Sequence, residues 1–283
     1  MHIITSPTAM EEWRAEKNAK KASVGFVPTM GFLHEGHASL IEESIVNNAH
    51  TVVSIFVNPT QFTQSDDFEK YPRDFEGDAS TLRLLAVDVL YMPSASEMYP
   101  DGFDTTVDPG EIATILEGKS RPGHFNGVAT VVLKLLNTVT PQNAYFGKKD
   151  RQQLAVIRQV VQDLGLSVNI IGCNTVRSEE GLALSSRNAR LTPEQSVAAR
   201  VLSTALREMC ESYRQGERNA SALLSVGQRV LNSEPMCATD YLVLVDAVTM
   251  KTVQSPTDSS VICVAGVFGS IRLIDNTDLR QFV

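Results

Sequence analysis

Short apolar runs alternate with stretches of helical spacing through the part of the chain before residue 176. Residues 24–27 form an apolar, β-prone run, residues 37–49 repeat their apolar side chains at helical spacing, and residues 52–57 form a second apolar run. A strand, a helix and a strand within about thirty residues form a βαβ unit, whose two strands pair in parallel. This part of the chain is therefore expected to contain a parallel sheet.

The same alternation is found on both sides of this unit. A short strand at 3–4 and a helix from about residue 8 precede it, and a polar loop over 66–74 follows it. Further strands are expected at 89–92, 144–146 and 168–171, with helices at 78–86, at 128–139 and around 154–161, and a long loop over 94–126. The expected fold class is α/β, with residues 1–176 forming a Rossmann-like parallel-sheet domain.

The pattern changes after residue 190. Thr192 suits the N-cap of a helix and Pro193 its first position, so a helix is expected to run to about residue 215. A second helix over 220–231 and strands over 241–245, 261–267 and 271–274 are expected to follow. Helices followed by strands indicate a separate, smaller α+β domain over residues 177–283, which is expected to close over a site at the domain boundary.

The turn after the first buried strand carries the first candidate chemistry. Pro28 favours a strand end there, and Gly31 and Gly36 permit close backbone approach. His34 and His37 lie at the start of the next helix, where exposed N–H groups and the helix dipole favour a phosphate. Two solvent-facing histidines are the alternative. A zinc site is less favoured, because the motif lacks the four-residue spacing and a nearby third ligand.

Polar residues also follow the second strand of the unit. Asn58 and Gln61 lie at the carboxyl end of a parallel strand, where open α/β sheets bind ligands, although Asn58 equally suits an ordinary turn. Asp78 opens the next expected helix. It can help to carry a hydrated Mg²⁺, or it can simply stabilise the helix N-terminus.

Three later segments have the composition of anion-binding loops. Arg121 and His124 lie among glycines in the long loop and suit an anion or a lid, or else a tethered surface loop. Lys149 follows a strand end and a glycine, where a lysine can neutralise phosphate charge unless it is only a surface residue. The serines and arginine at 185–187 offer donors for a triphosphate, although such a tripeptide also occurs in surface loops.

Composition narrows the functional classes. The 283 residues carry a net charge of −8, which argues against nucleic acid as a bulk electrostatic partner. No apolar run approaches the ~20 residues needed to cross a membrane, and the N-terminus does not resemble a signal peptide. Four cysteines without paired spacing are typical of a reduced, cytoplasmic protein.

Several longer motifs occur in order along the chain. Residues 28–37 read Pro-Thr-Met-Gly-Phe-Leu-His-Glu-Gly-His, residues 56–62 Phe-Val-Asn-Pro-Thr-Gln-Phe, residues 121–128 Arg-Pro-Gly-His-Phe-Asn-Gly-Val, and residues 181–188 Gly-Leu-Ala-Leu-Ser-Ser-Arg-Asn. Lys-Asp-Arg-Gln-Gln at 149–153 and Arg-Leu-Ile-Asp-Asn at 272–276 complete the set. The chain resembles the pantothenate synthetase family of the His-x-Gly-His nucleotidyltransferase superfamily, relatives of class I aminoacyl-tRNA synthetases.

This resemblance implies a set of site residues. ATP would contact Met30, Gly31, Phe32, Leu33, His34, Glu35, Gly36, His37, Gly147, Lys148, Lys149, Asp150, Val176, Leu184, Ser185, Ser186 and Arg187. Gln61 and Gln153 would bind pantoate, Gln61 also β-alanine, and Asn58 is a further substrate-binding candidate. Lys148 departs from the family, which usually has glutamate there, so the charge beside the expected ATP site is reversed.

The resemblance also implies a reaction. ATP would activate (R)-pantoate as an adenylate, and β-alanine would displace AMP to give pantothenate, with Mg²⁺ on the phosphates. His34, His37 and Lys149 would be the catalytic residues, with His37 as proton donor; the helix start would lower the pKa of His37, so its protonation state is open. The family further implies a cytoplasmic homodimer. The competing hypotheses are an adenylyltransferase that keeps AMP on its product, and a nucleotide-sensing regulator without turnover.

Overall fold

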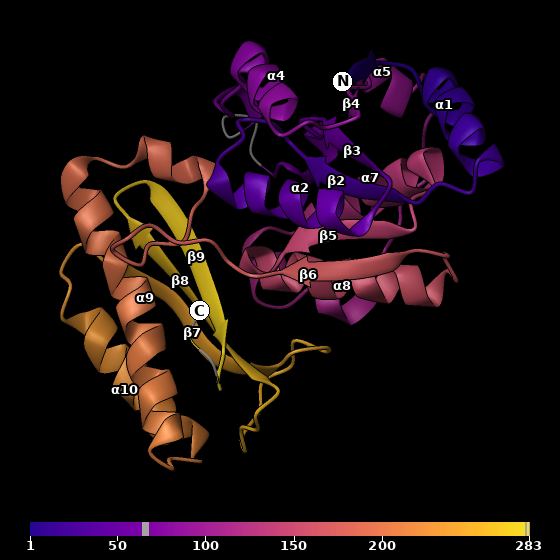
Figure 1. Cartoon of the computed structure of the whole chain (residues 1–283). Helices are drawn as coiled ribbons and strands as arrows, with labels where there is room; N and C mark the ends of the chain where they lie inside the picture. The colour runs from indigo at the N-terminus through magenta and orange to yellow at the C-terminus, as the bar shows by residue number, and fades with distance from the viewer. Residues whose placement is uncertain (64–67, 281, 283) are drawn as a thin grey trace. The chain divides into compact units, whose positions relative to one another are not determined.

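A computed structural model describes residues 1–63, 68–280 and 282. Residues 66 and 67 of the expected polar loop therefore lie outside the described residues. The chain divides into two compact units (Figure 1). The first unit comprises Met1–Gly147 and Val156–Cys173, and the second comprises Lys148–Ala155 and Asn174–Val283. The expectation that a second domain closes over the site stays a prediction.

A six-stranded parallel sheet forms the centre of the first unit. Its strands are β1 (His2–Ile4), β2 (Val24–Thr29), β3 (His50–Ile55), β4 (Val89–Tyr91), β5 (Asn143–Gly147) and β6 (Asn169–Cys173). The strand order is β1-β4-β3-β2-β5-β6, and each neighbouring pair is parallel. The predicted α/β fold class is confirmed. The strand expected at 24–27 extends through Pro28 to Thr29, because these two residues still pair with Ser54 and Ile55 of β3.

Helices connect these strands. They are α1 (Pro7–Ala19), α2 (Glu35–Asn47), α4 (Phe75–Leu84), α5 (Ala95–Met98), α6 (Glu117–Ser120), α7 (His124–Val139) and α8 (Arg151–Asp163), with short 3₁₀ turns η1 (Pro59–Gln61) and η2 (Gly110–Ala113). Helices α2 and α4 contribute Leu40, Ile41 and Leu82 to a core cluster with Val27 of β2 and Val53 of β3. The apolar residues whose spacing predicted α2 therefore form the face of the helix that is buried against the sheet.

The long loop expected over 94–126 is wrong in part. It contains α5, η2 and α6, and α7 begins at His124 rather than at residue 128. The sequence does not signal this helix start, because the N-cap is Gly123, which adopts a left-handed conformation with φ of 82° and has no side chain to cap the helix. The first turn of α7 is instead fixed by side-chain contacts to η1, which are distant in sequence.

The strand order reverses at β2. From β2 the sheet grows through β3 and β4 on one side and through β5 and β6 on the other. Ligands of open α/β sheets bind at such a switch point, beyond the carboxyl ends of the strands. The turn at 30–34 follows β2, and Asn58 follows β3, so the first unit brings two predicted site segments to one edge of its sheet.

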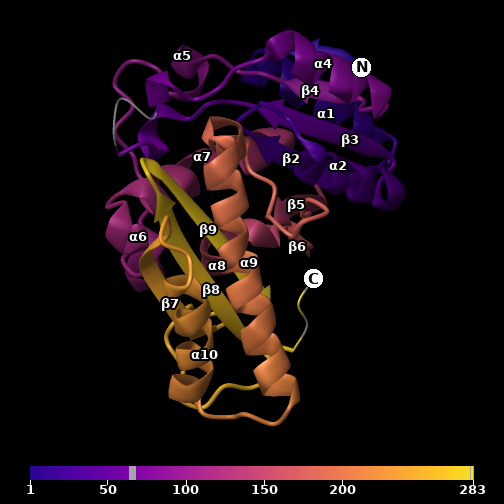
Figure 2. The same cartoon turned by 90° about the vertical axis from the view of Figure 1, so that its left-hand side faces the viewer.

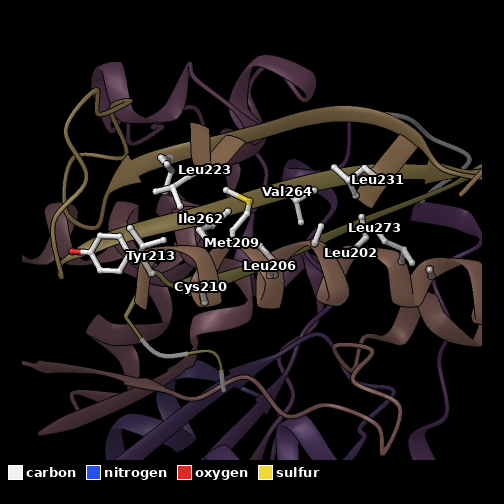
Figure 3. Close-up of a cluster of buried hydrophobic side chains, with 14 of the residues drawn as sticks. Leu202, Leu206, Met209, Cys210, Tyr213, Leu223, Leu231, Ile262, Val264 and Leu273 are labelled. Atoms are coloured by element: carbon white, nitrogen blue, oxygen red, sulfur yellow. The ribbon is translucent and has the colours of Figure 1, made fainter. Parts of the chain in front are cut away.

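The second unit consists of an antiparallel sheet with two long helices (Figure 2). Its elements are η3 (Lys148–Asp150), η4 (Ser186–Arg190), α9 (Pro193–Arg214), α10 (Ala220–Asn232), β7 (Ala238–Asp246), β8 (Ser260–Phe268) and β9 (Ile271–Asp278). Thr192 caps α9 as predicted, in a reciprocal capping box with Gln195. The helices and the sheet share one apolar core, part of which Figure 3 draws, with Leu206 and Met209 of α9 packed among Leu223 of α10 and Ile262 of β8.

Strand β9 runs four residues beyond the expected end at Ile274. Asp275 and Asn276 are poor strand formers, so the sequence pattern fades there, but pairing with β8 continues through Asp278. Among the described residues, no helix combines the length and apolar character needed to cross a bilayer.

Candidate active site

Two histidines of the first unit, His34 and His37, cap helix α2 with their rings. Nδ1 of His34 accepts from the Gly36 N–H at 3.1 Å, and Nδ1 of His37 accepts from the His34 N–H at 3.3 Å. The ring centroids lie 4.1 Å apart. A ring nitrogen that accepts a hydrogen bond carries no proton, so this network assigns the proton of each neutral ring to Nε2. The turn thus holds two imidazole N–H donors at a helix N-terminus, as an anion site requires.

The backbone before these histidines is held by a buried carboxylate. Phe32 N donates to Asp78 Oδ2 at 2.8 Å, and Leu33 N donates to Asp78 Oδ1 at 2.7 Å. Phe32 adopts a φ of 53°, which is uncommon for a residue with a side chain. A Cβ on Gly31 would lie 2.8 Å from Asp78 Oδ2, so the close approach requires glycine. Asp78 therefore fixes the shape of the turn that ends in His34.

Asp78 sits in the first turn of α4, but it is not the residue that caps that helix. Asp74 is the N-cap and accepts from Gly77 N at 3.0 Å. Burial raises the pKa of the Asp78 carboxyl, and the two backbone N–H bonds oppose that rise. Both Asp78 oxygens already accept hydrogen bonds, and the described residues contain no group of three acidic, histidine or cysteine side chains arranged for a metal. The carboxylate therefore suits backbone positioning better than a metal ligand.

Asn58 and Gln61 are both buried at the end of β3. Asn58 Nδ2 donates to Gln61 Oε1 at 3.1 Å and to the Gly127 carbonyl at 3.2 Å. Its Oδ1 accepts from the Tyr99 hydroxyl at 2.7 Å. Gln61 Nε2 lies 3.1 Å from the Met30 sulfur. Asn58 is thus a turn residue that also orients Gln61, and its own contact with substrate stays a prediction.

Arg121 and His124 support the same glutamine, a role that the sequence analysis missed. His124 Nδ1 lies 2.7 Å from the Gln61 carbonyl oxygen, and Arg121 Nη1 lies 3.1 Å from His124 Nε2. Because Nδ1 faces a carbonyl, it donates, and Nε2 accepts from the guanidinium. The helix that follows Arg121 comes close to η1, since a Cβ on Gly127 would lie 2.4 Å from the Thr60 carbonyl oxygen. In the sequence this segment was recognised by its glycines and by the motif at 121–128, neither of which indicated a contact with Gln61.

The second unit holds the other predicted segments. Its lysine turn is η3, residues 148–150. Lys149 Nζ lies 3.4 Å from Asp150 Oδ1, and Lys148 Nζ donates to Asn174 Oδ1 at 2.8 Å, so Lys148 has a partner on the neighbouring loop. Gln153 is half-buried in the first turns of α8. The structure thus places Lys148, Lys149, Asp150 and Gln153 on one short segment.

The serine segment, residues 185–187, begins η4. Ser185 caps η4, and its Oγ accepts from the Arg187 N–H at 3.3 Å. The chain reaches this cap through a tight turn, in which the Leu184 N–H donates to the Val176 carbonyl at 3.0 Å. Val176 and Leu184, both predicted ATP contacts, are therefore paired at the base of that turn.

Comparisons with known proteins cover nearly the whole chain. A family profile described as "Pantoate-beta-alanine ligase" matches residues 2–278. A pantothenate synthetase from Roseiflexus castenholzii is 48% identical over 269 residues, which cover 95% of this chain and 97% of that protein. Another from Acetivibrio thermocellus is 48% identical over 263 residues, 93% of each chain.

Solved structures agree with these sequences. The crystal structure of pantothenate synthetase from Thermus thermophilus matches with a TM-score of 0.93 and 43% identity, covering 99% of this chain and 100% of that one. The ligase structure from Francisella tularensis, described as complexed with "Beta-gamma ATP and Beta-alanine", matches with a TM-score of 0.79 and 38% identity, covering 99% and 98%.

Proposed function

Because the chain belongs to the pantoate-beta-alanine ligase family, we propose that the segments described above carry the two steps of that family's reaction. The enzyme condenses (R)-pantoate with β-alanine at the expense of ATP, through a pantoyl adenylate, and releases AMP and pyrophosphate. Family membership favours this ligase over an adenylyltransferase and over a regulator without turnover.

The single observation that carries the assignment of roles is the pair of ring-capped histidines at the start of α2. In the first step a pantoate carboxylate oxygen attacks the α-phosphorus of ATP, and the bond to the bridging oxygen of pyrophosphate breaks. His34 and His37 would act as neutral Nε2–H donors to phosphate oxygens, which stabilises the charge that develops there. A neutral ring donates a hydrogen bond without having to give up a proton.

Gln61 would bind pantoate and β-alanine in the first unit. Its amide is oriented by Asn58, and its backbone carbonyl accepts from His124, so little rotational freedom remains to be lost on binding. The β-alanine amine then attacks the carbonyl of the adenylate, AMP leaves, and the amine loses its proton. Met30, Gly31, Phe32, Leu33, Glu35, Gly36 and Gly147 would contribute backbone and shape to the ATP contacts of this unit.

In the second unit Lys149 and Arg187 would supply positive charge to phosphate oxygens, and Ser185 and Ser186 would supply hydroxyl donors. Lys148, Asp150, Val176 and Leu184 would contact ATP, and Gln153 pantoate. Mg²⁺ would be held mainly by the phosphate oxygens of ATP, whose charge it neutralises, because Asp78 is engaged with the backbone. A cytoplasmic homodimer is proposed from the family resemblance alone.

Omission of substrates one at a time tests this proposal. AMP is expected only when ATP, pantoate and β-alanine are all present, whereas pantoate alone supports exchange of pyrophosphate into ATP. An adenylylated product without free AMP would contradict the reaction. The same assay at graded Mg²⁺ tests the metal, and sedimentation of the purified protein tests the dimer.

Alanine variants test the residue roles. His37→Ala and Lys149→Ala are expected to lower pyrophosphate exchange by about 10²-fold or more, since each removes a donor aimed at developing charge. Lys20→Ala, at an exposed position just after α1, is the control and is expected to match the wild type. Full activity of either site variant would contradict its assigned role while leaving the reaction itself intact.

A further inference from the structure

The proposed reaction assigns no role to the motif Arg-Leu-Ile-Asp-Asn at residues 272–276. It lies on β9, where side chains alternate between buried and partly exposed positions from Ile271 to Ile274. The alternation then stops, and Asp275, Asn276 and Thr277 are all buried. Successive residues of a strand point to opposite faces, so both faces of β9 are covered at this point by polar contacts.

Asn276 binds the backbone of the lysine turn. Its Nδ2 donates to the Lys148 carbonyl at 3.0 Å and to the Lys149 carbonyl at 2.8 Å. Both amide protons of one side chain are therefore used to fix two consecutive peptide groups, and those peptides set the direction in which the Lys149 side chain leaves η3. Asn276 is only 5% exposed, so water has little access to replace its hydrogen bonds to the two carbonyls.

Asp275 binds the turn that leads to the serine segment. Its two oxygens accept from Arg177 Nη1 at 2.6 Å and from Nη2 at 3.0 Å, which is a bidentate pair. Arg177 also donates to the Gly181 carbonyl at 3.2 Å and forms a β-bridge with Ala183. That bridge lies two residues before Ser185, so the ion pair fixes the base from which the serine segment extends.

We propose that Asp275 and Asn276 are positioning residues of the adenylation step, which hold the lysine turn and the serine segment of the second unit in one fixed relation through adjacent residues of β9. The proposal rests on the proposed roles of Lys149 and of residues 185–187. Asn276 acts through Lys149, and Asp275 acts through Arg177. Neither is assigned a contact with substrate.

The key variant is Asn276→Asp, which keeps the shape of the side chain but places a carboxylate oxygen against two carbonyl oxygens. Pyrophosphate exchange is expected to fall by about 10- to 100-fold, as displacement of a catalytic group by about 1 Å can do. The KM for pantoate is expected to change by less than about threefold. Asn219→Asp makes the same chemical change at the N-cap of α10, where aspartate caps equally well, and is expected to match the wild type.

A double-mutant cycle separates this proposal from a merely structural role. If Asn276 acts through Lys149, then Asn276→Asp has little further effect in a Lys149→Ala background. Equal fold-losses in both backgrounds would overturn the inference. Wild-type activity of Lys149→Ala would instead overturn the proposed role of Lys149 itself, so the two failures are distinguishable. If Asn276→Asp does not fold, judged by thermal melting, Asn276→Ala takes its place in the same cycle.

Asp275→Asn tests the second half, with Asp240→Asn as the matched control. Asp240 also accepts two bonds from one arginine, Arg272 of the same strand as Asp275, but it lies at an exposed position. Asp275→Asn is expected to lower exchange at least about tenfold in the fully folded protein, and Asp240→Asn less than about twofold. Equal activity of the two variants would overturn the role of Asp275.

Discussion

At the scale of single residues, two buried side chains shape the backbone that carries the proposed catalytic groups. Asp78 receives the N–H groups of Phe32 and Leu33, and Asn276 donates to the carbonyls of Lys148 and Lys149. The Asp78 carboxylate can only accept hydrogen bonds, and it faces two N–H donors. The Asn276 amide N–H₂ group can only donate, and it faces two carbonyl acceptors. Asp78→Asn would place an amide N–H₂ against a backbone N–H, and Asn276→Asp would place a carboxylate oxygen against backbone carbonyls.

For Asp78 the expected consequence is a loss of both stability and activity. Asp78→Asn turns an amide N–H₂ toward a backbone N–H, which leaves a buried donor unpaired at a cost of about 1–3 kcal/mol. Thermal melting is expected to show this loss, and pyrophosphate exchange is expected to fall at least about tenfold because the turn before His34 loosens. Glu76→Gln, an exposed acid in the same helical turn, is the control.

A magnesium role for Asp78 predicts a different result. The variant would then keep its melting temperature and recover activity as Mg²⁺ is raised. Recovery of that kind would contradict the positioning role.

At the scale of elements, the contact between α7 and η1 decides where Gln61 lies. Gly127→Ala would place a Cβ 2.4 Å from the Thr60 carbonyl oxygen and 2.7 Å from the Gln61 backbone nitrogen. Overpacking against backbone is expected to cost about 1–3 kcal/mol of stability and to raise the KM for pantoate more than that for ATP. Asn137→Ala, at an exposed position of α7, is expected to change neither quantity. A loss of kcat with unchanged KM values for both substrates would contradict the inference that the contact between α7 and η1 positions Gln61.

Helix α9 carries a thiol that reports on the core of the second unit. Cys210 is fully buried among Leu206, Met209 and Tyr213, and burial raises its pKa to about 12. It is expected to resist alkylation at about pH 8 until the protein unfolds, whereas the half-buried Cys173 and Cys237 react first. Rapid labelling of Cys210 in the folded protein, located by peptide mass, would contradict this burial.

The same shift makes stability depend on pH in the alkaline range. The folded state keeps the Cys210 proton up to about pH 12, while an unfolded thiol loses it near its ordinary value of 9.0. The unfolded state therefore binds fewer protons between these values, and stability falls as pH rises, by up to about 1.4 kcal/mol per pH unit. Cys210→Ala is expected to show a shallower fall between about pH 9 and 11 in urea unfolding, and an unchanged slope would exclude Cys210 as its source.

Elements with local signals could be predicted from the sequence, and contacts between distant residues could not. Thr192 and Pro193 have the preferences of an N-cap and a first helical position, so they predict the start of α9 locally. The continuous apolar run of β8 likewise predicts a strand without knowledge of its neighbours. The bond between Phe32 and Asp78 joins residues 46 apart. Strand β9 continues through Asp275 and Asn276 because they pair with β8, and their side chains contact segments distant in sequence. The motifs supplied the candidate site residues and also contained His124, Asp275 and Asn276, but no local signal in the sequence indicated the contacts through which these three residues hold distant segments.

At the scale of the whole molecule, the chain passes between the two units after Gly147, after Ala155 and after Cys173. The core of the second unit nevertheless draws its residues from Ala198 to Leu279, within one continuous stretch. A fragment of residues 174–283 is therefore expected to fold alone with a cooperative thermal transition, although it lacks Lys148–Ala155. The matched control is residues 174–270, which removes β9 and is expected to melt without cooperativity. A broad, non-cooperative melt of the longer fragment would contradict an autonomous core.

The place of Asn276 on the last strand has a consequence for the timing of synthesis. Its partner Lys149 precedes it by 127 residues. At about 5–20 residues per second, a ribosome needs roughly 6–25 s to add them. The nascent chain therefore completes its histidine turn well before its lysine turn, which stays without this contact until Asn276 has been added. A chain that stops just before Asp275 would keep most of the apolar core of the second unit but would leave the lysine turn without its contacts to Asn276.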